Sequence, residues 1–107
     1  MTRKIYDKLI RDRIPEIIRA DGRECGVEVM SEEDYRQSLF QKVVEEAQEV
    51  AEASPEKLIA ELADLYEVID AIRAAFGLDE QAVRAMQAQR RKERGGFVQR
   101  FQLLWTD

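Results

Sequence analysis

At 107 residues and 12.4 kDa, the chain is long enough for one domain with a hydrophobic core and too short for two, so we expect a single domain over residues 1–107. Hydrophobic residues make up 45% of the chain and charged residues 36%, with two prolines and five glycines, a composition typical of a helical protein and unlike a disordered or collagen-like one. The net charge of −5 argues against binding a nucleic-acid polymer through its phosphates.

Cysteine and histidine usage narrows the chemistry further. Cys25, the single cysteine, cannot form an internal disulfide, which either fits a reducing compartment or makes redox chemistry irrelevant, and we expect a cytoplasmic protein. No stretch approaches the roughly 20 apolar residues of a membrane helix, and no signal-peptide pattern follows residues 1–4, so no membrane association is expected. The absence of histidine excludes a Ser-His-Asp triad and a histidine-ligated zinc site, which leaves carboxylates to carry any catalysis.

Four helices are predicted in chain order. A short helix over residues 15–20 ends at Asp21-Gly22, and a long helix over residues 32–53 follows Ser31 as its N-cap. The other two span residues 55–76, after Ser54 and ending at Gly77, and residues 79–94, ending at Gly95-Gly96. The first two long helices are expected to form a tight antiparallel hairpin.

Two short segments show the alternation of a β-strand. Val27 and Val29 alternate with Glu28 and Met30 over residues 26–30. Near the end of the chain, a period-2 pattern includes Phe97, Phe101 and Trp105. We expect these segments to pair as a small two-stranded β addition to an all-α fold. The three aromatic residues would then either stack a nucleotide base or fill the core, and strand spacing favours the core.

The first long helix carries a carboxylate where an apolar side chain is expected. With Leu39 at zero on a helical wheel of about 100° per residue, Tyr35, Val43 and Val50 define the core-facing arc and Glu46 falls inside it, at about −20°. Glu49, at about −80°, lies at the edge of this arc.

The second long helix repeats this feature. Its core-facing arc is predicted around Leu58, with Leu62, Leu65, Ile69, Ile72 and Phe76 within about 40° of it. Glu61 lies at about −60° and Asp64 at about −120°, at the border of the arc. An unpaired buried carboxylate is costly, so it requires a raised pKa, a basic partner or a bound cation.

Hairpin geometry brings these acids together. Residues equidistant from the turn face one another, which pairs Glu49 with Glu61 and Glu46 with Asp64. Within each helix the two acids are three residues apart and share a face. Four clustered carboxylates repel unless cations neutralise them, and oxygen ligands suit Mg²⁺ or Mn²⁺. The alternative is an ordinary solvated acidic face, which we favour for Glu45 and Glu52 but not for Glu46 and Glu61.

At these residues the sequence resembles the all-α nucleoside triphosphate pyrophosphohydrolases of the MazG-like superfamily. Their pattern of E-E-x-x-E followed by E-x-x-D is matched by residues 45–49 and residues 61–64. Residues 8–15, KLIRDRIP, and residues 94–97, RGGF, resemble the house-cleaning, phosphoribosyl-ATP pyrophosphohydrolase-like branch. The resemblance therefore spans nearly the whole chain.

The resemblance implies a MazG-like helical bundle around the hairpin and hydrolysis of a nucleoside triphosphate between its α and β phosphates. It also implies that Glu46, Glu49, Glu61 and Asp64 hold magnesium and form the catalytic site, with Glu46 or Glu49 as a candidate acceptor of the attacking water's proton.

Basic residues are candidates for binding the substrate's phosphates. Lys42 lies one turn before Glu46, where it would bind phosphate or pair with Glu45 and Glu46. For Lys8 and Arg11 the alternatives are phosphate binding and an anchoring salt bridge. Arg94 precedes a glycine pair that would let the backbone approach a ligand, whereas Lys92 fits a helix C-terminus.

A second apolar side on the first long helix indicates an oligomer. Phe40, Val44, Ala47 and Ala51 widen its apolar arc to about 180°, more than one contact would use. A central position in a bundle is one explanation. We favour a homodimer or higher homo-oligomer, as the superfamily's dimers and tetramers imply.

Two other functions compete with house-cleaning of non-canonical nucleotides. One is phosphoribosyl-ATP pyrophosphohydrolase activity in histidine biosynthesis, which keeps the chemistry and changes the substrate. The other is a catalytically silent helical interaction module whose acids are surface charges. The identity of the base is not indicated by any residue.

Overall fold

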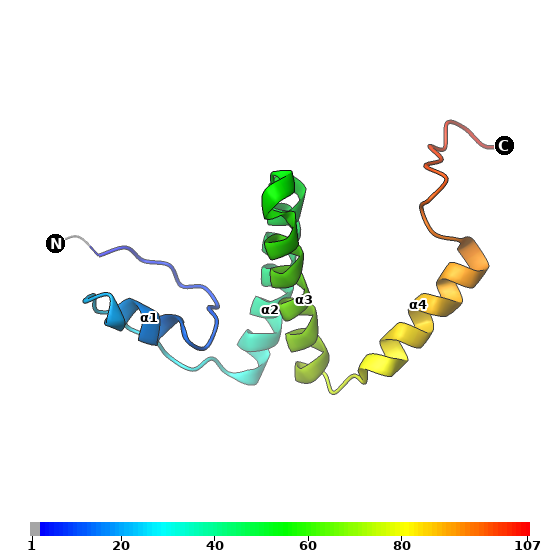
Figure 1. Cartoon of the computed structure of the whole chain (residues 1–107). Coiled ribbons are helices and arrows are strands. Elements are labelled where there is room, and N and C mark those ends of the chain that lie inside the picture. The colour runs from blue at the N-terminus through cyan, green and yellow to red at the C-terminus, as the bar shows by residue number, and fades with distance from the viewer. Residues whose placement is uncertain (1–2) are drawn as a thin grey trace.

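The computed structural model describes residues 3–107, and this part of the chain is all-helical (Figure 1). Its elements are α1 (Ile14–Ala20), α2 (Glu32–Glu52), the 3₁₀ turn η1 (Pro55–Lys57), α3 (Leu58–Ala75) and α4 (Glu80–Arg94). The four predicted helices are therefore confirmed, with boundaries that differ by at most three residues.

Helix caps explain most of these boundaries. The Ser31 hydroxyl accepts a hydrogen bond from the Asp34 amide at 3.1 Å, as predicted for an N-cap, and Asp79 caps α4 in the same way. Ser54 differs from its prediction, because its side chain makes no capping bond and Pro55 opens a 3₁₀ turn before α3. At the other end of α3, Gly77 takes a φ of 64°, a conformation that favours glycine.

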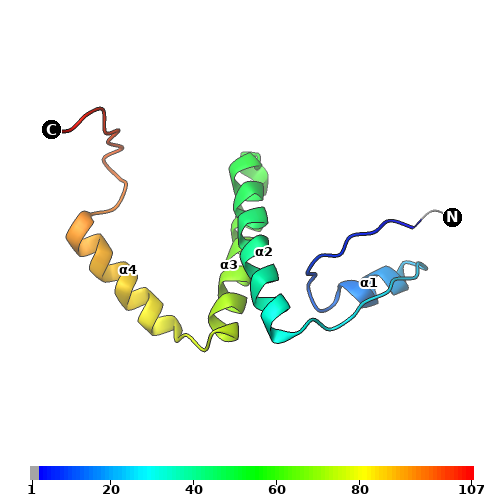
Figure 2. The ribbon, with the colours of Figure 1, turned by 180° about the vertical axis from the view of Figure 1, so that it is seen from behind.

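The centre of the fold is the hairpin of α2 and α3, which lie side by side in both views (Figures 1 and 2). Leu39 of α2 and Val68 of α3 are its buried apolar side chains among the described residues, at 2% and 8% exposure. Tyr35, Val43 and Val50 are half-buried on the same side of α2, so the arc predicted for this helix is confirmed.

The arc predicted for α3 is displaced. Leu58, Leu62, Ile69 and Phe76 are each 38% exposed, whereas Val68 is the residue of α3 buried against the hairpin. The contacting side of α3 is thus rotated by roughly 80° from Leu58 toward Val68. This rotation turns Glu61 and Asp64 toward α2.

The predicted β addition is wrong, since residues 3–107 contain no strand. Val29 is 99% and Phe101 86% exposed, so neither segment has a partner. A turn joins Phe97 to Arg100, whose amide donates to the Phe97 carbonyl at 3.1 Å and whose φ is 59°, which interrupts the extended run. An isolated two-stranded ribbon is marginal in water, so period-2 alternation alone could not secure one. The aromatic residues near the end of the chain therefore do not fill a core within it.

One chain does not close into a bundle. Figures 1 and 2 show α1 and the N-terminal segment extending to one side of the hairpin, and α4 with the C-terminal segment extending to the other. The radius of gyration is 18.5 Å, compared with about 13 Å for a compact domain of this length. Within residues 3–107, no helix combines the length and the apolar character needed to cross a bilayer.

Candidate metal centre

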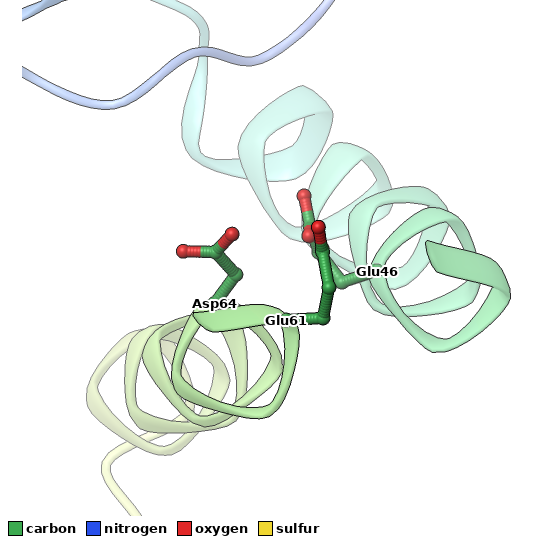
Figure 3. Close-up of side chains that lie close together, drawn as sticks. All are labelled: Glu46, Glu61 and Asp64. Carbon is green, nitrogen blue, oxygen red and sulfur yellow. The ribbon is translucent and has the colours of Figure 1, made fainter. Parts of the chain in front are cut away.

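Three carboxylates converge where α2 and α3 face each other. One oxygen from each of Glu46, Glu61 and Asp64 lies within 4.8 Å of the other two (Figure 3). Glu46 projects from α2, whereas Glu61 and Asp64 project from successive turns of α3. The spacing of three residues aligns the two α3 carboxylates on one side, and the antiparallel hairpin places Glu46 at their level.

Three of the four predicted ligands are thus brought together, and Glu49 is not. Glu49 is exposed and does not belong to the group of converging oxygens. It lies about 60° around α2 from Glu46, toward solvent, so its carboxylate would have to bend back to reach the other three. The prediction that the four acids converge is confirmed for Glu46, Glu61 and Asp64 and is wrong for Glu49.

Glu46 is a largely buried member of the cluster. Its side chain is 14% exposed, and burial raises its pKa above the ordinary value of a glutamate. The Lys42 ammonium, 3.7 Å from Glu46, acts in the opposite direction, and the negative charges of Asp64, Glu45 and Glu61 raise the pKa further. An ionised Glu46 is therefore under electrostatic strain that a cation would relieve.

The basic residues predicted near the site form ion pairs. Arg11 donates to Asp64 Oδ1 at 2.6 Å, and Lys8 lies 3.8 Å from Glu45, so the N-terminal segment crosses the acidic side of the hairpin. Lys42 also lies 3.5 Å from Glu45. In this structure these basic residues therefore form salt bridges with carboxylates, which was the alternative to phosphate binding. All are at least partly solvated, which limits what each adds to stability.

The remaining candidates lie elsewhere. Arg94 ends α4, which extends away from the carboxylates, so one chain does not bring Arg94 to them. Lys92 is in the last turn of α4, as expected for a cation at a helix C-terminus. Glu45 and Glu52 are exposed, in agreement with a solvated face, and Gln48 donates to Glu52 at 2.9 Å.

Sequence reasoning did not assign Arg11 to Asp64. The two residues are 53 positions apart, and no periodic pattern connects an irregular segment to a particular carboxylate on a helix. The only signal was the density of basic residues in residues 8–13 of an otherwise acidic chain.

The arrangement suits a small hard cation. Oxygens bound to Mg²⁺ at about 2.1 Å lie at most about 4.2 Å from each other, so carboxylate oxygens within 4.8 Å need only small side-chain adjustments to share one ion. Three carboxylates also supply more negative charge than one divalent ion neutralises, which leaves capacity for a second ion or a basic partner. Glu46, Glu61 and Asp64 are the residues that would hold the divalent cation.

The raised pKa of Glu46 predicts a pH-dependent stability difference in the protein without metal. A carboxyl whose pKa is raised by folding stabilises the fold at low pH, and this contribution is lost as the pH rises through the raised pKa. The Glu46→Gln variant has no carboxyl to ionise at this position, so it does not lose this stability as the pH rises. Its melting temperature relative to wild type is therefore expected to increase as the pH rises through the raised pKa of Glu46, and to level off above it.

Thermal denaturation followed by circular dichroism in EDTA across this pH range measures the difference. Glu52→Gln is the matched control, because it removes the same charge from an exposed position of α2. Parallel melting curves for wild type and Glu46→Gln at all pH values would contradict the electrostatic description of the cluster.

No protein-family model matches the chain, and no solved structure matches it. The chain is 44% identical over 46 residues to an uncharacterized protein of Mycolicibacterium smegmatis, a match that covers 43% of this chain and 47% of that relative. The matched segment thus spans about half of the relative's length. The name of this relative indicates no activity.

Proposed function

We propose that the protein is a Mg²⁺-dependent nucleoside triphosphate pyrophosphohydrolase that releases a nucleoside monophosphate and pyrophosphate, with non-canonical nucleotides as its substrates. The convergence of Glu46, Glu61 and Asp64 on an antiparallel hairpin carries the proposal. The resemblance of residues 45–49 and 61–64 to the MazG-like motif supplies the reaction type. Mn²⁺ would serve in place of Mg²⁺, since both prefer oxygen ligands.

A divalent cation at this cluster would neutralise phosphate charge and orient a water for attack on the α phosphorus. Glu46 and Glu49 are the candidates for accepting the proton of this water. Glu46 is better placed to keep it out of bulk solvent, because its side chain is only 14% exposed, whereas Glu49 is exposed. Glu61 and Asp64 would complete the ligand set from α3.

Basic side chains already at the rim of the cluster would bind the phosphates. Arg11 pairs with Asp64, and Lys8 and Lys42 pair with Glu45. A cation bound to the Asp64 carboxylate would displace Arg11 from it and would free the Arg11 guanidinium. A planar guanidinium matches two phosphate oxygens at once, so Arg11 would move from carboxylate to substrate at little cost.

A pyrophosphate-release screen tests the proposal. Canonical nucleotides, modified nucleotides and phosphoribosyl-ATP are assayed with Mg²⁺, with Mn²⁺ and with EDTA. We expect metal-dependent release of pyrophosphate with at least one nucleoside triphosphate. Release from phosphoribosyl-ATP alone would instead assign the protein to histidine biosynthesis, and no release from any compound would contradict the proposed function.

The exposed apolar side chains favour a second candidate, a catalytically silent interaction module. Phe97, Val98 and Phe101 are each at least 86% exposed, and exposed apolar patches of this kind are typical of protein–protein interaction surfaces. Calorimetric titration with Mg²⁺ separates the two functions. If the protein is an enzyme, wild type should bind Mg²⁺ and the Glu46→Gln variant should bind it more weakly. Absence of Mg²⁺ binding in both wild type and the variant would favour the interaction module.

A further inference from the structure

Two ion pairs connect the N-terminal segment to the hairpin, one to each helix. Arg11 Nη2 lies 2.6 Å from Asp64 Oδ1 of α3, and Lys8 Nζ lies 3.8 Å from Glu45 Oε1 of α2. Because Asp64 belongs to the converging carboxylates, residues 8–11 bridge α2 and α3 directly beside them.

The surroundings of Arg11 allow its side chain to change position. Its guanidinium is 56% exposed, and it precedes α1, a helix with no buried residue that extends to one side of the hairpin (Figures 1 and 2). Leu9 and Ile10, which come just before it, are half-buried. Arg11 can therefore leave Asp64 without opening a packed core, while its neighbours keep the segment close to the hairpin.

Arg11 contacts an atom group that a metal ion would need. A divalent cation at the cluster would bind the Asp64 carboxylate at about 2.1 Å, and Arg11 already holds one oxygen of this carboxylate at 2.6 Å. The two positive groups would share one oxygen or lie on neighbouring oxygens of the same carboxylate. They repel each other in either arrangement, so they compete for Asp64.

The charge balance of the cluster favours displacement of one basic residue. The three converging carboxylates and Glu45 carry four negative charges when ionised, and Lys8, Arg11 and Lys42 pair with members of this set. One negative charge is then left over. A divalent cation added to the complete set would leave an excess positive charge, whereas loss of one basic residue would restore neutrality.

Arg11 is the basic residue best placed to leave. Lys42 is carried by α2, is only 17% exposed and lies within 3.7 Å of both Glu45 and Glu46, so its position is fixed by the helix. Lys8 contacts Glu45, which is not one of the converging carboxylates. Arg11 combines direct contact with a converging carboxylate, an irregular backbone and a solvated side chain.

We propose that Arg11 is a built-in competitor of the divalent cation: it holds Asp64 when no cation is bound, lowers the affinity of the site for the cation, and leaves Asp64 when the cation binds. This inference rests on the proposed metal centre and adds a regulatory contact to it. Coupling between two binding events is reciprocal, so the cation weakens the Arg11 contact by the same factor by which Arg11 weakens cation binding.

Calorimetric titration with Mg²⁺ and with Mn²⁺ measures this competition. The Arg11→Gln variant is expected to bind the cation about fivefold more tightly than wild type, the factor that corresponds to a favourable exposed ion pair. Arg13→Gln is the matched control, because it removes the same charge two residues further on. The partner of Arg13 is Glu16, at 2.7 Å, which is not one of the converging carboxylates. The cation affinity of this control should stay within about twofold of wild type.

Melting temperatures in EDTA and in saturating Mg²⁺ give a second readout that does not depend on hydrolysis. In EDTA the Arg11→Gln variant should melt below wild type, because it lacks the ion pair with Asp64. In Mg²⁺ this difference should disappear, because the cation has already displaced Arg11 in wild type. A contact with a purely structural role would stabilise the protein equally under both conditions, as we expect for Arg13.

The outcomes separate this inference from the proposed function. Equal or weaker cation binding by Arg11→Gln, with binding retained in wild type, would overturn the competition and leave the metal centre in place. No binding by wild type or by Arg11→Gln would overturn the metal centre itself. Should Arg11→Gln lose helical circular dichroism, Arg11→Lys replaces it. Lysine keeps the charge without the planar two-armed geometry, so this variant should also bind the cation more tightly than wild type, by a smaller factor.

Discussion

Replacing Glu46 by glutamine is expected to slow pyrophosphate release by roughly a hundredfold or more, because the change removes one charge and one strong metal oxygen where the chemistry develops charge. The structure places this carboxylate at the interhelical contact, 14% exposed and within 4.8 Å of the Glu61 and Asp64 carboxylates through one oxygen of each. Glutamine keeps the size of the side chain and its packing. The expected loss is therefore one of rate rather than of folding.

Glu52→Gln is the control for this variant. Glu52 lies on the same helix, is exposed, and accepts a hydrogen bond from Gln48 at 2.9 Å. Its replacement should leave activity within about twofold of wild type, as is usual for exposed single charges. Both variants are assayed for pyrophosphate release at saturating Mg²⁺ with the nucleotide that the screen identifies. Comparable activity in the two would mean that the carboxylate cluster is not the reaction centre.

Local signals made the helices predictable. Ser31 begins α2 with the hydrogen bond that its position predicts, and Gly77 and Gly95 follow the ends of α3 and α4 in conformations that favour glycine. Such signals depend on a few neighbouring residues, so they are visible in the sequence. The strand predictions depended on a distant partner strand as well, and the alternation around Val29 could not supply one.

The two faces of the hairpin were not equally predictable. On α2, the arc around Leu39 includes Tyr35, Val43 and Val50, so the side facing α3 could be recognised even though Phe40 and Val44 extend the apolar surface of this helix. Helix α3 has apolar residues on two sides, around Leu62 and around Val68, and a helical wheel does not tell which side meets α2 and which is left for another contact. The structure assigns Val68 to the hairpin, which leaves Leu62 and Tyr66 uncovered.

The candidate site was predictable to the extent that it depends on the hairpin. Glu46, Glu61 and Asp64 converge because helical spacing and an antiparallel turn dictate their level. Glu49 shares this level but not the side, a difference of about 60° that decides exposure. The ion pair of Arg11 with Asp64 depends on the path of an irregular segment, which hydrophobic periodicity does not describe.

Asp64→Asn should abolish pyrophosphate release and leave the metal-free protein at least as stable as wild type. The change removes a ligand charge, and it also removes the repulsion of Asp64 with Glu46 and Glu61. It breaks the ion pair with Arg11, whose two side chains are 56% and 45% exposed, a kind of contact typically worth about 1 kcal/mol or less. Relief of repulsion should offset this loss.

Asp70→Asn is the matched control for this variant. Asp70 lies on the same helix and forms an ion pair with Arg73 at 2.7 Å, at 58% exposure, but is not one of the converging carboxylates. It should lose a similar ion pair and keep activity within about twofold of wild type. Melting temperatures in EDTA and rates in Mg²⁺ are measured for both variants. A large loss of metal-free stability in Asp64→Asn alone would make Asp64 a structural anchor for Arg11 and remove it from the proposed metal centre.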